Sequence, residues 1–91
     1  MKKIYNLLAR LGDEYSAEKI VLFGSRARGD NREKSDIDIA VYGLDKNKRV
    51  RFSESVDELP TLLKFDIIFI DGTTDPVLIK NIEKDGVILY G

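Results

Sequence analysis

Apolar residues recur along the chain in two alternating patterns. From Lys2 to about Tyr15 they are spaced three or four residues apart, which predicts an amphipathic helix. Short apolar runs at Lys19–Phe23, Asp36–Tyr42 and Phe65–Ile70 are rich in β-branched residues and predict strands. Because the helical and strand patterns alternate, we expect a small sheet with helices packed on it.

The second half of the chain continues this alternation. A weaker helical pattern covers Phe52–Leu63, where Pro60 is expected to break or restart the helix. Asp75 is a candidate N-cap, with Pro76 at the first helical position. Val87–Tyr90 is expected to be a short terminal strand or an extended tail. The fold class is therefore α/β, of a two-layer α+β type, with a small mixed sheet of about four strands.

Composition limits the chemistry that this chain can perform. Its 91 residues are enough for a single domain spanning residues 1–91, with one modest core. The chain has no cysteine and no histidine, which excludes disulfides, ordinary zinc sites and histidine general bases. Any metal must be bound by oxygen, which favours Mg²⁺, Mn²⁺ or Ca²⁺.

The charge balance and the lack of a targeting signal bear on which partners and which cellular compartment we expect. The net charge of -1 gives no basic excess, so we expect no direct nucleic-acid binding. No segment reads as a signal peptide or approaches the ~20 apolar residues of a membrane span. We therefore expect a cytoplasmic protein with no membrane contact.

Two aspartates in the second predicted strand are the clearest candidates for chemistry. Asp36 and Asp38 are two residues apart, so on a strand they point to the same face. Ile37, Ile39 and Val41 point to the other face, which must be the core side. Adjacent carboxylates repel each other unless a cation lies between them, which indicates a metal site. The alternative is that both are ordinary solvent-exposed strand residues.

A third carboxylate and a tight turn add to this pattern. Asp66 interrupts an otherwise apolar strand, so we expect it to pair with a metal or a cation, or to lie at the edge of a cleft. Asp71 is its competitor, but it belongs to a turn and points to the opposite face. Gly24 permits close approach of the backbone to a phosphate, and Ser25 can cap the following turn or donate to a phosphate oxygen. By itself, Gly24-Ser25 could equally be a plain strand-to-helix turn.

Two arginines follow this turn. Arg26 and Arg28 both lie beside the predicted phosphate site, and arginine can bind phosphate through two hydrogen bonds. We expect only one of them to contact nucleotide and favour Arg28. The other is expected to pair with Asp30, Glu33 or another surface acid.

Together these residues resemble a known signature. Gly24-Ser25, ten further residues and then Asp36-x-Asp38 match the pattern of nucleotidyltransferases related to DNA polymerase β. The sequence of Gly24–Gly29, Gly-Ser-Arg-Ala-Arg-Gly, resembles that of the minimal nucleotidyltransferase (MNT) branch in particular. The resemblance implies a polymerase β-like core, with Gly24 and Ser25 on the β- and γ-phosphates of a nucleoside triphosphate. It also places the family's third acidic residue at Asp66.

The resemblance further implies a reaction and a partner. Asp36, Asp38 and Asp66 would hold two Mg²⁺ ions, with Mn²⁺ as an alternative, while AMP passes from ATP to a hydroxyl group. In HEPN–MNT pairs the acceptor is a tyrosine of a helical HEPN toxin, and its modification makes the MNT protein an antitoxin. ATP is a family expectation, because the sequence has no motif that reads the base.

Two other functions stay open at this stage. One is a small-molecule nucleotidyltransferase, similar to the aminoglycoside-modifying enzymes, with its acceptor site at a homodimer interface. The other is a non-catalytic module that binds nucleotide or partner without turnover. The presence of all three predicted carboxylates argues against loss of activity but does not prove turnover.

Overall fold

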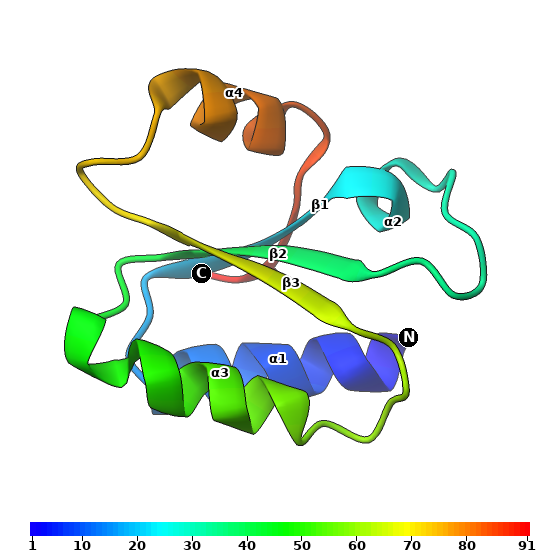
Figure 1. The fold of residues 1–91 in the computed structure, drawn as a ribbon, viewed down its shortest axis with the longest axis horizontal. Helices are drawn as coiled ribbons and strands as arrows, with labels where there is room; N and C mark the ends of the chain where they lie inside the picture. The colour runs from blue at the N-terminus through cyan, green and yellow to red at the C-terminus, as the bar shows by residue number, and fades with distance from the viewer.

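The computed structural model describes residues 1–91, and helices and strands alternate along it in the predicted order (Figure 1). The last segment is a strand rather than an extended tail. In chain order the elements are α1 (Lys2–Glu14), β1 (Lys19–Phe23), α2 (Gly24–Arg28), β2 (Ile37–Tyr42), the 3₁₀ turn η1 (Lys46–Lys48), α3 (Arg49–Asp57), β3 (Phe65–Ile70), α4 (Pro76–Asp85) and β4 (Val87–Tyr90).

The strands form one mixed sheet, as predicted. Their order is β3-β2-β1-β4. β1 is antiparallel to both of its neighbours, whereas β2 and β3 are parallel. A parallel pair needs a crossover connection, and η1 with α3 provides it. The prediction of a small four-stranded mixed sheet with packed helices is therefore confirmed.

The larger part of the core lies between the sheet and the helices α1 and α3, which cover one face (Figure 1). Ile37, Ile39 and Val41 are fully buried there, so the predicted core side of β2 is confirmed. Helix α1 contributes one apolar stripe of its surface, and α3 adds Phe52 and Val56 at helical spacing.

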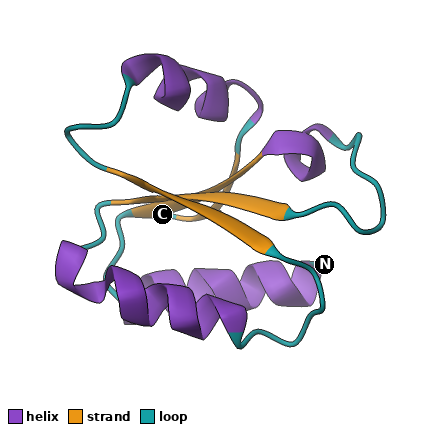
Figure 2. Ribbon diagram, viewed as in Figure 1, coloured by secondary structure: helices purple, strands orange, loops and turns teal.

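The other face of the sheet carries a smaller core that the sequence analysis did not anticipate. Helices α2 and α4 lie over this face (Figure 2), which adds a second helical layer to the expected two-layer packing. Val21, Ala40, Ile70 and Ile82 form its buried cluster. Ala40 shares its face with Asp38 but is covered completely, whereas Asp38 is only partly buried, so the aspartate end of this face of β2 stays accessible.

Two of the differences from the predicted element boundaries have clear physical reasons. β2 begins at Ile37 rather than Asp36, because the first ladder hydrogen bond runs from the Ile37 N–H to the Lys64 carbonyl (2.9 Å). α3 ends at Asp57, before Pro60, because proline cannot donate a helical hydrogen bond. None of the helices combines the length and the apolar character needed to cross a membrane.

Candidate functional site: a carboxylate edge beside a glycine turn

The predicted site residues come together at the end of the sheet where β1 finishes and where β2 and β3 begin. Asp38 pairs in register with Phe23 at the end of β1 and with Asp66 on β3. Neighbouring strands lie about 4.8 Å apart, so Asp66 is adjacent to Asp38. Asp36 immediately precedes β2 and shares the face of Asp38. We call the edge formed by Asp36, Asp38 and Asp66 the carboxylate edge.

The turn after β1 packs directly against the carboxylate edge. Gly24 has φ +73°, a backbone conformation that favours glycine, and a Cβ at this position would overlap Oδ2 of Asp38. The side chain of Ser25 makes none of the hydrogen bonds in the structure, while its carbonyl accepts from the N–H groups of Gly29 and Asp30 (2.9 and 3.1 Å). Gly24 therefore allows the backbone to lie close to the carboxylate of Asp38, and the hydroxyl of Ser25 is available to a ligand because it has no partner in the chain.

Burial and like charges dominate the electrostatics of the carboxylate edge. Burial raises the pKa of Asp38 above its usual value, and the negative charges of Asp66 and Asp36 raise it further, while Arg28 lowers it. Asp36 and Asp66 are exposed, and none of the three carboxylates takes part in an ion pair. A cation placed here would relieve this repulsion.

The donor set fits a hard divalent cation, although it is not closed around one. No three acidic side chains converge closely enough to form a preformed metal cage. The carboxylate edge nevertheless offers only oxygen donors with excess negative charge, which suits Mg²⁺ or Mn²⁺. Because Asp36 and Asp66 are exposed, their side chains are free to turn toward a cation.

The two arginines have different surroundings. The guanidinium of Arg26 donates to the carbonyls of Glu33 (3.0 Å) and Ser35 (3.0 and 3.1 Å), and so fixes the loop that leads into the carboxylate edge. Arg28 pairs with Asp30 (3.1 Å), but that pair is solvent-exposed and worth little energy. The pairing with a surface acid that was expected for the other arginine is therefore found at Arg28, whereas Arg26 binds backbone carbonyls instead. Because its ion pair is weak, the guanidinium of Arg28 can still turn toward a phosphate.

The two candidate third acids also differ. Asp66 is exposed at the carboxylate edge, where it neither pairs with a cation of the chain nor lines a cavity. Asp71 lies beyond the other end of β3 and accepts hydrogen bonds from Arg49 (3.0 Å) and Thr73 (2.6 and 2.8 Å). These hydrogen bonds, with those from Thr73 contributing most, hold the pKa of Asp71 well below its usual value. Asp71 therefore plays a part in the folded structure rather than at the carboxylate edge.

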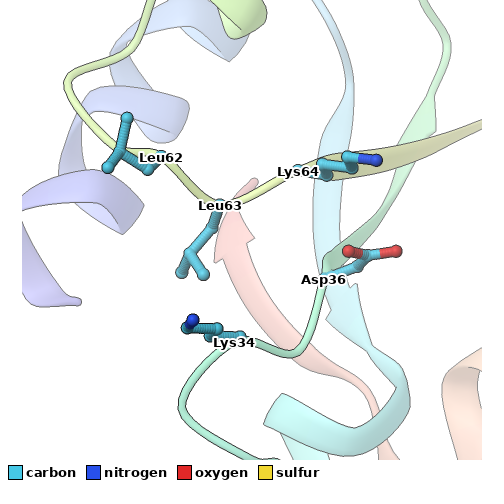
Figure 3. Close-up of a pocket in the computed structure, with 5 residues that line it drawn as sticks. All are labelled: Lys34, Asp36, Leu62, Leu63 and Lys64. Atoms are coloured by element: carbon cyan, nitrogen blue, oxygen red, sulfur yellow. The ribbon is translucent and has the colours of Figure 1, made fainter.

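One neighbour of the carboxylate edge was missed by sequence reasoning. Lys64 lies beside Asp36, since the residues that follow them, Phe65 and Ile37, are register partners. Figure 3 shows both side chains bordering a common cavity. No local sequence pattern indicates this placement, because it depends on the parallel pairing of β2 with β3.

The chain is similar to known proteins over most of its length. Residues 2–91 match the protein-family model described as "Polymerase beta, Nucleotidyltransferase". A Methanocaldococcus jannaschii protein named "Putative protein adenylyltransferase MJ1379" is 41% identical over 80 residues, which cover 82% of this chain and 79% of that protein.

Solved structures share the same fold. A crystal structure of a toxin-antitoxin with AMP-PNP superimposes with a TM-score of 0.72 and 26% identity, over 96% of this chain and 73% of the matched chain. A chain in the structure of a tri-AMPylated Shewanella oneidensis HEPN toxin in complex with MNT antitoxin matches with a TM-score of 0.71 and 24% identity. That match covers 99% of this chain and 71% of the other.

Proposed function

Because the chain belongs to the polymerase β nucleotidyltransferase family, we propose that it is a protein adenylyltransferase that moves AMP from ATP to a hydroxyl group of another protein. The observation that carries this proposal is the carboxylate edge, with the turn of Gly24 and Ser25 packed against it. The similarity to a relative named as a protein adenylyltransferase supports a protein acceptor.

Each side chain of the site has a proposed role. Asp36, Asp38 and Asp66 would hold Mg²⁺, with Mn²⁺ as an alternative, and the bound metal would offset the charge that develops on the phosphoryl oxygens. Gly24 and Ser25 bind the phosphate end of ATP through backbone N–H groups and the serine hydroxyl. Arg28 adds positive charge on the same side. Positioning and electrostatics provide most of the catalysis.

Asp66 is suited to act on the acceptor. It lies on the β3 side of the carboxylate edge, across β2 from the turn that would bind the phosphates. The acceptor hydroxyl attacks the α-phosphorus in line with the departing pyrophosphate, so acceptor and leaving group occupy opposite sides of that phosphorus. The Asp66 carboxylate is placed to accept the proton of the attacking hydroxyl.

We further propose a tyrosine of a HEPN-type toxin as the acceptor and residues 1–91 as one minimal nucleotidyltransferase domain acting as its antitoxin. Two neighbours support this: one is a toxin-antitoxin with AMP-PNP, and the other contains an AMPylated HEPN toxin. The exposure of Asp36 and Asp66 leaves the site open to an acceptor on another molecule. The cytoplasm is the proposed compartment, because the reaction consumes ATP.

The proposal is tested by labelling. Purified protein, Mg²⁺ and ATP labelled at the α-phosphate are added to an extract of source cells, and the label is followed on protein gels and by thin-layer separation of small molecules. We expect a labelled protein band with wild type and with Asp71→Asn, and none with Asp36→Asn/Asp38→Asn. Label in a small molecule instead would overturn the protein acceptor, and label in neither fraction would contradict the transferase activity.

A further inference from the structure

The largest cavity of the molecule, about 500 Å³, opens beside the carboxylate edge (Figure 3). It lies between the loop that precedes β2 and the loop that precedes β3. We call it the lysine–leucine cavity, because its five lining residues are Lys34, Asp36, Leu62, Leu63 and Lys64.

Its position relative to the phosphate turn separates it from the nucleotide side. Gly24 and Ser25 follow β1, on one side of β2, whereas Lys64 and its neighbours precede β3, on the other side. The hydrogen bond from the Ile37 N–H to the Lys64 carbonyl (2.9 Å) ties the cavity wall to the start of β2. The cavity therefore adjoins the side of Asp36 from which an acceptor would approach.

Its lining carries two lysines and one carboxylate, that of Asp36, so its formal charge is positive, and neither lysine is paired. The three ion pairs of the structure are Lys19–Glu83, Arg28–Asp30 and Arg49–Asp71, so neither Lys34 nor Lys64 is paired. Both lysines are exposed, and neither side chain donates a hydrogen bond within the chain. Two unpaired ammonium groups on one cavity rim would attract carboxylates of a bound molecule.

Its apolar part is also exposed. The side chain of Leu62 is fully exposed (104%), the highest value among the large apolar residues of the chain. Leu63 is half-buried and packs against the main core, which gives the cavity a fixed apolar wall. An exposed apolar side chain beside a reactive site is a suitable contact for an aromatic ring.

We propose that the lysine–leucine cavity docks the acceptor and is selective for an acidic protein segment that carries the acceptor tyrosine. This rests on the proposed adenylyltransferase function. The leucines contact the tyrosine ring, and Lys34 and Lys64 pair with the carboxylates that flank it. The tyrosine oxygen forms a bond to the α-phosphorus of ATP, and the bond from that phosphorus to the bridging oxygen breaks. Pyrophosphate leaves with the electron pair, and the phenolic proton passes to Asp66.

The test uses binding, which does not require turnover. Two fluorescein-labelled pentapeptides with a central tyrosine are compared, one flanked by four glutamates and one by four lysines. Anisotropy is measured with the full chain in the presence of Mg²⁺ and AMP-PNP. We expect the acidic peptide to bind at least about tenfold more tightly than the basic one, with a preference that weakens as salt is added.

Matched variants locate the binding. Lys34→Gln/Lys64→Gln removes both cavity charges, and Lys46→Gln/Lys80→Gln removes two exposed lysines outside the cavity with the same change in net charge. We expect the first pair to weaken acidic-peptide binding about tenfold and the control pair to change it by less than about twofold. Circular dichroism verifies that both variants are folded, and Leu62→Ser provides a second, uncharged probe that should also weaken binding.

Three outcomes would overturn this proposal: no preference for the acidic peptide, equal effects of the two lysine pairs, or a cavity variant that loses AMP-PNP affinity rather than peptide affinity. The last result would assign the lysines to the nucleotide. Failure of the proposed function is distinguishable, because it removes label transfer from ATP while the peptide preference remains.

Discussion

The two ends of strand β3 carry the same kind of side chain in opposite circumstances. Asp71, beyond one end, accepts hydrogen bonds from Arg49 and Thr73, and its pKa is lowered. Asp66, near the other end, has no cationic partner and lies in register with Asp38.

The difference separates a structural carboxylate from one held for a ligand. Favourable partners around Asp71 stabilise the fold whenever that residue is charged. At the carboxylate edge, burial and then the like charges of Asp66 and Asp36 raise the pKa of Asp38, so the charged form of Asp38 is disfavoured in the folded chain. Such an arrangement is suited to bind a cation, because the cation converts repulsion into attraction.

The largest expected effect comes from removing the two carboxylates at the start of β2, Asp36 just before the strand and Asp38 within it. Asp36→Asn/Asp38→Asn should lower AMP transfer about a thousandfold or more, since the site loses most of its metal donors. The same change should leave the melting temperature unchanged or raise it, because it removes like-charge repulsion. Transfer rates and thermal melts of the purified variant measure both. A variant that melts far below wild type would contradict the view that these carboxylates are electrostatically unfavourable in the folded chain.

The two ends of β3 are compared directly by a pair of identical substitutions. Asp66→Asn should reduce AMP transfer about a hundredfold, because the attacking hydroxyl loses its proton acceptor. Asp71→Asn, just after the other end of β3, should keep wild-type transfer rates while lowering the melting temperature. Equal losses of activity in the two variants would remove the distinction between them.

Gly24 and Gly29 form a second matched pair. Both have positive φ (+73° and +82°), so alanine should cost about 1 kcal/mol of stability at either position. Only at Gly24 would the added Cβ also displace the carboxylate of Asp38, since nothing lies within 4 Å of the corresponding position at Gly29. We expect Gly24→Ala to lower transfer at least about tenfold and Gly29→Ala to lower it little. The rates of AMP transfer by the two variants test this, and equal rates would contradict it.

The smallest effect is a pH dependence of stability. The folded-state pKa of Asp71 lies below its usual value of 3.8, so its contribution is fully present above about pH 4 and is lost as the pH falls toward the folded value. The melting temperature of Asp71→Asn should therefore lie below that of wild type at pH 7, and the gap should close below pH 4. A difference in melting temperature that stays constant from pH 7 to pH 2 would contradict a stabilising role for the Asp71 carboxylate and its partners Arg49 and Thr73.

Local patterns were sufficient to predict most of the fold. The alternation of apolar positions placed the sheet and its main core, because both periodicities depend on residues close in sequence. The second core around Ala40 was missed. Its cover comes from Ile82 on α4, about forty residues away, and no local pattern links the two. Pro60 was predicted to break or restart the helical pattern of Phe52–Leu63, and α3 in fact ends at Asp57, before the proline.

The candidate site could be predicted in its residues but not in its neighbours. Asp36 and Asp38 follow from strand periodicity, and Asp66 from a charge in an apolar run. Their meeting at one edge depends on the parallel register of β2 with β3, which also brings Lys64 beside Asp36. The structural use of Arg26 likewise depends on loop carbonyls whose positions the sequence does not specify.

The central claim is that the carboxylate edge binds a divalent cation together with nucleotide. Mn²⁺ binding to wild type, Asp38→Asn and Asp71→Asn, followed by electron paramagnetic resonance in the presence of AMP-PNP, tests this most directly. We predict that wild type and Asp71→Asn bind Mn²⁺ in a nucleotide-dependent manner, and that Asp38→Asn binds it at least about tenfold more weakly. Equal Mn²⁺ affinity in all three proteins would contradict the account.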